Sequence, residues 1–170
     1  MALKKDKTAR YYYHVSQKRI NEDSPVDNIL FTPLGSDKCG GRGAYEPTDS
    51  RTCVTPTISQ CFTALSNNVW SEEGRVWYIY RTRNKVQACF PYDVPDSHIT
   101  DERWLVRPIR FKIIAALDLS RSRLKWPEPT DEAGSPDRKC LEAQLHYLQL
   151  MKNRLVKTNI DKMNIVEWVK

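Results

Sequence analysis

The sequence has no long apolar run, no closely spaced cysteine pair and no internal repeat. A helix that crosses a bilayer needs roughly 20 apolar residues, whereas the longest apolar stretches here, 113–117 and 76–80, have the length of strands. We therefore predict that the chain does not enter a membrane. The basic N-terminus leads into three tyrosines and a histidine rather than into an apolar segment with a cleavage site, so we expect a cytoplasmic protein.

The five cysteines are an odd set without a CxxC spacing, which argues against a disulfide framework and against a four-cysteine zinc site. We interpret them as reduced thiols. A zinc site would have to combine scattered cysteines and histidines, and a site for another divalent ion would use Asp93, Asp96 and Asp101. These aspartates lie close to prolines and are typical of turns, so we predict no metal site.

Length and composition are those of an ordinary globular chain. The 170 residues are enough for one hydrophobic core, and the sequence predicts a single folded domain. The net charge of +6 makes an anionic partner plausible, with nucleic acid as one candidate. Basic residues are spread over an N-terminal arm (1–10), the middle of the chain and the C-terminal region, however, and scattered charge is also typical of a solvated surface.

Local patterns predict an α+β fold with short helices. Residues 75–82 alternate as a half-buried strand does, and residues 109–117 form a second strand after Pro108. Residues 55–57 are suited to cap a helix over 58–66. Shorter strands are predicted at 10–15, 28–31, 52–54 and 104–106, for a sheet of five or six strands. The tract 21–51 is loop-rich, and a loop of this length is often functional.

The C-terminal third has a different character. Residues 123–136 contain three prolines and are predicted to link the domain (11–122) to a helical extension (137–170). Ser135 is suited to cap the first helix of the extension. Leucines then recur at helical spacing, which is more typical of docking on the parent domain than of a partner site. The last residues, 160–169, have the pattern of another short helix.

Three segments carry a resemblance to a known family. They are Tyr-His-Val-Ser at 13–16, the strand and helix of 51–65, and the segment 100–113, in which a glutamate leads into an apolar strand, a proline and a second strand. In this order they resemble the ADP-ribosyltransferase superfamily. The resemblance covers roughly residues 11–119. It implies a split, mostly antiparallel β-sheet and NAD as cofactor.

The resemblance also implies roles for individual residues. Glu102 would be the catalytic carboxylate, which stabilises the positive charge that develops on the ribose when the nicotinamide bond breaks. His14 and Ser16 would bind the nicotinamide-side ribose and amide. Thr55 and Thr57 lie in the segment that would wall the nicotinamide pocket.

Two further residues come from the loop-rich tract. Arg42 lies in the run Gly-Gly-Arg-Gly (40–43), which is similar to the glycine-arginine loop of RES-type NAD-degrading relatives, where an arginine faces the phosphates. Tyr45 is a candidate for the family's ring-stacking tyrosine. Thr100 stands where many protein-modifying members carry Glu or Gln. Together with the positive charge, this favours a nucleic-acid acceptor over a protein acceptor, and hydrolysis by water stays open as an alternative.

Each residue also has a purely structural interpretation. His14 would then be a satisfied histidine at a strand end, Glu102 would belong to a solvated turn with a local ion pair, and Arg42 would lie in a surface loop. Two other function classes follow. One is a non-catalytic nucleotide- or nucleic-acid-binding protein of microbial or viral origin, and the other is an interaction protein that uses its C-terminal helix.

Overall fold

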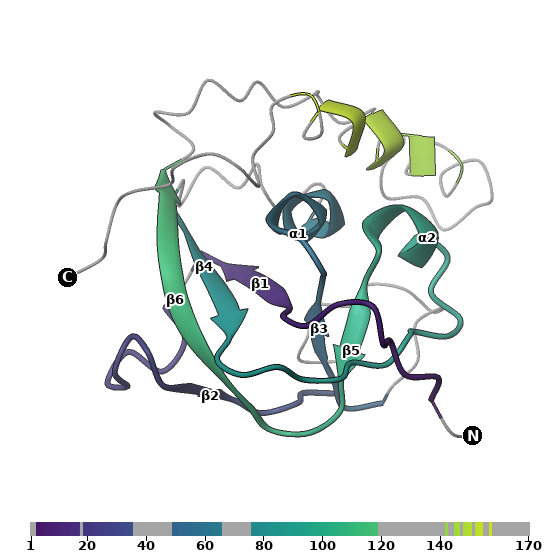
Figure 1. Cartoon of the computed structure of the whole chain (residues 1–170). Coiled ribbons are helices and arrows are strands. Elements are labelled where there is room, and N and C mark those ends of the chain that lie inside the picture. Colours follow the sequence, from purple (N-terminus) through teal and green to yellow (C-terminus); the bar gives the residue numbers. More distant parts are fainter. Residues whose placement is uncertain are drawn as a thin grey trace.

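The computed structural model describes residues 3–17, 19–35, 49–65 and 76–118, and part of the segment 142–157. The elements follow one another along the chain (Figure 1) as β1 (Tyr13–Ser16), β2 (Ile29–Phe31), β3 (Thr52–Val54), α1 (Ile58–Leu65), β4 (Val76–Thr82), α2 (Ser97–Thr100), β5 (Arg103–Leu105) and β6 (Ile109–Asp118). The predicted strands and the predicted helix are all present to within a few residues. The short helix α2 was not predicted, because its four residues are too few to show a helical period.

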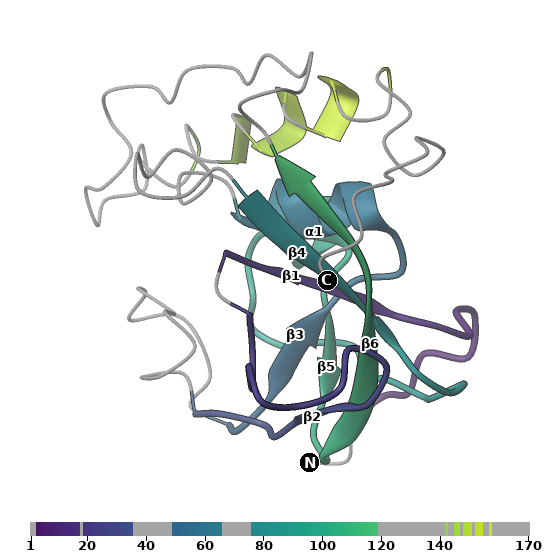
Figure 2. The ribbon, with the colours of Figure 1, turned by 90° about the vertical axis from the view of Figure 1, so that its left-hand side faces the viewer.

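The strands form two antiparallel sheets, so the predicted α+β class is confirmed. One sheet has four strands in the order β1-β4-β6-β2, and the other pairs β3 with β5. Backbone hydrogen bonds join the sheets at two places. Tyr13 and Thr55 exchange bonds of 2.8 and 3.0 Å, and Leu34 and Arg51, which lie after β2 and before β3, exchange bonds of 3.1 and 2.8 Å. Figure 2 shows β3 and β5 beside the larger sheet.

The six predicted strands do not form a single sheet of five or six strands, because they are divided between two sheets at Pro108. β5 and β6 flank this proline, but β5 belongs to the two-stranded sheet and β6 to the four-stranded sheet. A proline cannot donate a ladder hydrogen bond, and here it lies in the connection where the chain passes from one sheet to the other. The chain therefore uses Pro108 as a crossing point.

The two longest strands divide the core into two clusters. The register of β4 on β6 shifts between Ile79 and Tyr80, so the buried side chains before and after this irregularity face different surroundings. Trp77 and Ile79 pack with α1, whereas Tyr80 and Phe111 pack with residues of β2, β3 and β5. The helix α1 thus belongs to one core cluster of the larger sheet, and the smaller sheet belongs to the other.

The start of α1 follows from its capping residues. The backbone N–H of Gln60 donates to Thr57 Oγ1 at 3.3 Å, and the side chains of the two residues also contact each other at 2.7 Å. This Thr-x-x-Gln arrangement satisfies backbone groups that the first turn of a helix leaves unpaired. The predicted cap is confirmed.

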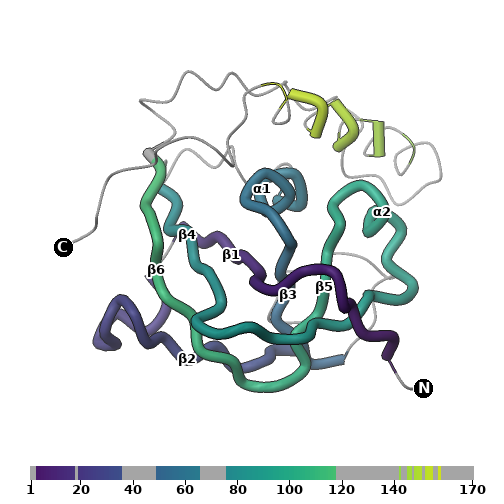
Figure 3. Tube along the Cα trace, viewed as in Figure 1, coloured from purple at the N-terminus to yellow at the C-terminus, as the bar shows by residue number. Residues whose placement is uncertain are grey.

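The N-terminal arm packs against the rest of the chain (Figure 3). Asp6 N–H donates to Ala88 O at 2.8 Å, and Phe90 N–H donates to Lys4 O at 2.7 Å. Asp6 is fully buried, whereas the neighbouring lysines are exposed. The arm therefore has a structural role in addition to its charge.

The described residues of segment 142–157 are helical, as predicted, and Leu148 is buried. The predicted linker 123–136 and the predicted helix 160–169 lie outside the described residues. Among the residues that the structure describes, none of the helices has the length and apolarity needed to cross a bilayer. Cys53, Cys61 and Cys89 are free thiols.

Candidate functional site

His14 lies in the middle of β1 and is tied to the smaller sheet. Its Nδ1 is 2.9 Å from the carbonyl oxygen of Cys53, and its ring packs edge-on to Phe31 with centroids 5.2 Å apart. Burial lowers the pKa of His14, although the bond to Cys53 partly offsets this effect. A carbonyl oxygen only accepts, so Nδ1 carries the proton of the neutral ring and Nε2 keeps its lone pair.

Ser16 follows His14 by two residues on the same strand. Side chains alternate along a strand, so Ser16 and His14 project from the same face of β1. Their partners across the ladder, Tyr78 and Tyr80, project from the same face of β4. The predicted His–Ser pair therefore shares one face of the larger sheet.

Glu102 directly precedes β5 and is held by an indole. Its Oε1 accepts a 2.7 Å hydrogen bond from Trp104 Nε1, and the side chain is half-buried. The preceding Asp101 has the left-handed conformation (φ 56°, ψ 34°), and its N–H donates to Ser97 O at the end of α2. Aspartate tolerates this conformation better than most residues, so the turn aims Glu102 without a glycine.

A buried arginine fixes the backbone around Glu102. Arg103 Nη1 donates to the carbonyl oxygens of Asp101 and Glu102, both at 2.9 Å. Its Nε is 2.9 Å from Asp6 Oδ2, and its Nη2 is 2.8 Å from Asp101 Oδ1. Burial alone raises the pKa of Asp6, but the hydrogen bonds from Thr8 and the Arg103 guanidinium outweigh it and lower this pKa. The arm therefore supports the turn that carries Glu102.

Cys53 lies between the two predicted site residues. In the β3–β5 register it faces Trp104, and its carbonyl accepts from His14. Burial, together with the nearby Glu102 carboxylate, raises the pKa of the Cys53 thiol well above its ordinary value, and Arg51 offsets this only in part. The thiol is therefore protonated at neutral pH, which argues against a role as nucleophile. Cys53 instead contributes to the site as a common contact of His14 and Glu102.

Arg51 is a site residue that the sequence analysis did not single out. Its side chain is only 2% exposed, and its guanidinium carbon lies 4.5 Å from the centre of the Trp104 ring. Arg51 and Cys53 are two residues apart on one segment, and Glu102 and Trp104 are two residues apart on the next. This double i, i+2 pattern is a signal that could have identified Arg51, Cys53 and Trp104.

Thr55 and Thr57 lie in the predicted segment, with hydroxyls that make internal hydrogen bonds. Thr55 Oγ1 donates to Thr57 O at 2.7 Å and lies 2.9 Å from Cys61 Sγ, while Thr57 caps α1. The two threonines shape the turn from β3 into α1. Arg42 and Tyr45 lie outside the described residues.

The carboxylates that could have formed a metal site do not cluster. Within the described ranges, no group of three or more His, Cys, Asp or Glu side chains is arranged to hold a metal ion. Asp101, one of the three candidates, instead accepts from Gln60 Nε2 at 2.9 Å and pairs with Arg103.

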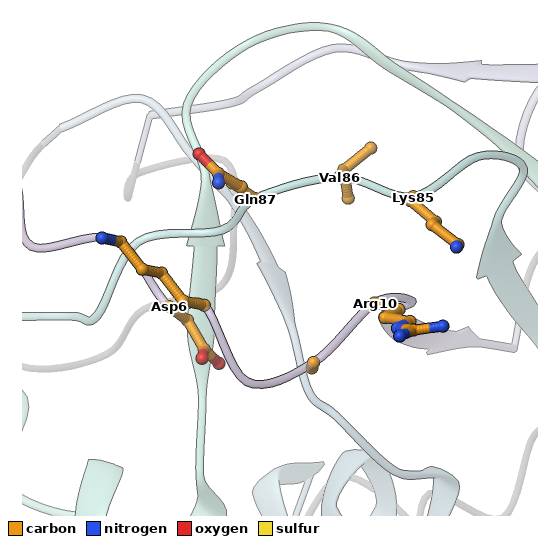
Figure 4. Close-up of a pocket in the computed structure, with 7 residues that line it drawn as sticks. Asp6, Arg10, Lys85, Val86 and Gln87 are labelled. Carbon is orange, nitrogen blue, oxygen red and sulfur yellow. The ribbon is translucent and has the colours of Figure 1, made fainter.

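An open cavity of about 410 Å³ lies elsewhere, between the N-terminal arm and residues 85–87. Figure 4 shows Arg10 and Lys85 at one end of this cavity and Asp6 at the other. None of the predicted site residues lines it. The cavity and the His14–Glu102 region are therefore separate features.

Comparison with known proteins adds no relative. No family model matches the chain, and neither a curated protein nor a solved structure matches it. The functional argument therefore depends on the residues themselves.

Proposed function

We propose that this chain is an ADP-ribosyltransferase-like enzyme that binds NAD and cleaves its nicotinamide–ribose bond, passing ADP-ribose to an acceptor or to water. One observation carries the proposal. His14, from β1, and Glu102, directly before β5, both interact with Cys53 of β3: the imidazole binds its carbonyl oxygen, and the carboxylate raises the pKa of its thiol. The two residues that the resemblance selected independently thus share one neighbour.

The surroundings of Glu102 support this chemistry. When the glycosidic bond breaks, its electron pair leaves with nicotinamide, and positive charge builds on the ribose. A carboxylate near that carbon stabilises the charge, and Glu102 is oriented for such a role by Trp104 and by the backbone that Arg103 holds. The acceptor oxygen or nitrogen then bonds to the ribose carbon and loses its proton.

His14 suits a binding role more than a charged one. The lowered pKa keeps the imidazole neutral at pH 7, so Nε2 is an acceptor that can bind a ribose hydroxyl. A neutral ring adds no repulsion to the positive charge that forms on the ribose. The two antiparallel sheets are consistent with the split sheet that the resemblance implies.

The test is release of nicotinamide from NAD by the purified protein, alone and with added protein or nucleic acid. The Glu102→Gln variant keeps an oxygen that can accept from Trp104 but removes the charge, so we expect release to fall by about 100-fold or more. Glu22→Gln, which removes an exposed carboxylate, is the matched control and should be unaffected. Undiminished release by Glu102→Gln would exclude Glu102 as the catalytic group. No release under any condition would overturn the enzyme assignment.

A second candidate function is non-catalytic binding of a nucleotide or nucleic acid. Basic side chains that oppose one another on the larger sheet favour it, and this candidate does not require Glu102. Oligonucleotide binding by a protein that never releases nicotinamide would establish it.

A further inference from the structure

Basic side chains face one another across β4 and β6. Arg81 lies directly opposite Lys112 in the ladder, and the N–H of Arg83 donates to Arg110 O at 2.8 Å, which makes these two arginines the next pair. Opposed residues in an antiparallel ladder have Cβ atoms about 5 Å apart, and like charges in such positions repel. The repulsion within these two successive pairs therefore destabilises the pairing of β4 with β6.

Nothing acidic in the described part of the chain relieves this repulsion. Arg83 Nη1 and Arg110 Nη1 both donate to a single acceptor, Asn28 Oδ1, at 2.9 and 3.1 Å. That oxygen belongs to a neutral amide. No described carboxylate forms an ion pair with any of these basic residues. Within the described ranges, the ion pairs of Asp6 and Asp101 are both with Arg103. The two pairs therefore bring four positive charges together without an acidic partner among the described residues.

The positive charge continues into the cavity of Figure 4. Val86 N–H donates to Arg10 O at 3.3 Å, so Lys85 and Arg10 are neighbours, and both side chains line the cavity. The one acid in its lining, Asp6, is already paired with Arg103. Tyr11 follows Arg10 along the chain, and the centre of its ring lies 4.9 Å from the Arg81 guanidinium. We call this surface the basic face; its members are Arg10, Arg81, Arg83, Lys85, Arg110 and Lys112.

We propose that the basic face binds single-stranded nucleic acid. Phosphates supply the negative charge that the opposed pairs lack, and surfaces that bind single strands combine such charge with aromatic rings on which bases stack. Tyr11, already stacked on a guanidinium, is the aromatic group here. Proteins that read a duplex instead insert a helix or a β-ribbon into a groove, whereas this surface is the side of a sheet.

The inference deepens the proposed function by naming the class of acceptor. Only this assignment of an acceptor rests on the proposed function. A bound strand would be the substrate that receives ADP-ribose. The binding itself requires neither NAD nor Glu102. It can therefore be measured with the cofactor absent.

The test is fluorescence anisotropy of a labelled single strand of about 16 nucleotides, a length that spans a typical single-strand site. The full chain is titrated without NAD at several salt concentrations. The double variant Arg83→Gln, Arg110→Gln removes two exposed charges, so we expect at least a tenfold weaker affinity. The slope of log K against log salt should become shallower by about 1.4, because each single-strand phosphate contact contributes about 0.7.

The matched control is Lys4→Gln, Lys5→Gln, which removes the same charge from exposed positions at the start of the arm and should change affinity less than twofold. Equal losses in both double variants would overturn the proposal, since net charge alone would then be responsible. Equal affinity for a duplex would exclude the preference for single strands. Displacement of the strand by poly-glutamate at equal charge would point to an acidic protein instead.

The two proposals fail in different ways. If wild-type protein and Glu102→Gln bind the strand equally but neither releases nicotinamide, the basic face stands and the enzyme does not. If nicotinamide is released in the Glu102-dependent way but the strand does not bind at low salt, the enzyme stands and the basic face is excluded.

Discussion

The two sheets of this protein are stabilised by different chemistry. The four-stranded sheet buries large apolar side chains, among them Ile29, Ile79 and Phe111. The two-stranded sheet includes or adjoins the two buried arginines, Arg51 and Arg103. A sheet of two strands is at best marginally stable by itself. Besides the buried apolar side chains of Val54, Trp104 and Leu105, it is stabilised by ion pairs, a cation–π contact and hydrogen bonds to neighbouring segments.

This difference explains where chemistry can occur. Burying a charge is costly unless it is paired, so each buried charge beside the smaller sheet must be held at one place by its partners. Arg103 illustrates this, because it contacts Asp6, Asp101 and the backbone of Glu102. Precise placement of charged groups is what a catalytic site requires. The larger sheet supplies rigidity, and the smaller one holds the candidate catalytic group.

The largest expected effect on stability is at the four-stranded sheet. Phe111→Ala removes a fully buried ring between the sheets, and we expect the free energy of unfolding to fall by about 4 kcal/mol. Urea denaturation followed by tryptophan fluorescence measures this change. Val76→Ala, at an exposed position of the same sheet, is the control. A loss of less than 1 kcal/mol for Phe111→Ala would contradict the assigned core.

A somewhat smaller effect on stability is expected at the two-stranded sheet. Asp6→Asn keeps the shape but leaves Arg103 with less compensating charge, and we expect a loss of about 3 kcal/mol in the same measurement. Asp27→Asn, which changes an exposed carboxylate, should change stability by less than about 0.5 kcal/mol. If the two variants were equally stable, the ion pair between Asp6 and Arg103 would not stabilise the smaller sheet.

The smallest effect tests the contact between the sheets. The pKa of His14 is lower in the folded protein than in the unfolded chain, so below about pH 6.5 the unfolded state binds more protons. Stability that is present above this pH is therefore lost as pH falls, by up to about 1.4 kcal/mol per pH unit. Denaturation midpoints from pH 7.5 to 5 should fall more steeply for wild type than for His14→Gln. Parallel curves would show that folding does not lower the pKa of His14.

Much of the fold could be predicted because its signals are local. The alternation of 75–82 and the helix cap within 55–57 both involve neighbours in sequence, and both features are confirmed. Ordinary sequence patterns do not show which strand pairs with which. The assignment of β5 to a sheet of its own with β3 therefore came only from the structure.

The candidate site divides in the same way. His14 and Glu102 could be selected from the sequence because each lies in a short motif of the family that the chain resembles. Arg51 and Trp104 could not, because a buried arginine over an indole depends on the pairing of two distant strands. The same holds for the basic face, in which Arg81 meets Lys112 only through the β4–β6 register.

By itself, the sequence determined the strand and helix segments, the excess of positive charge and the identity of the groups able to do chemistry. These properties depend on residue type and on neighbours within a few positions. Only the tertiary structure decided that His14 and Glu102 share Cys53, that Asp6 supports the turn before β5, and that like charges oppose each other on the larger sheet. Such contacts arise because burial brings distant segments together, and the geometry of that packing selects which side chains meet.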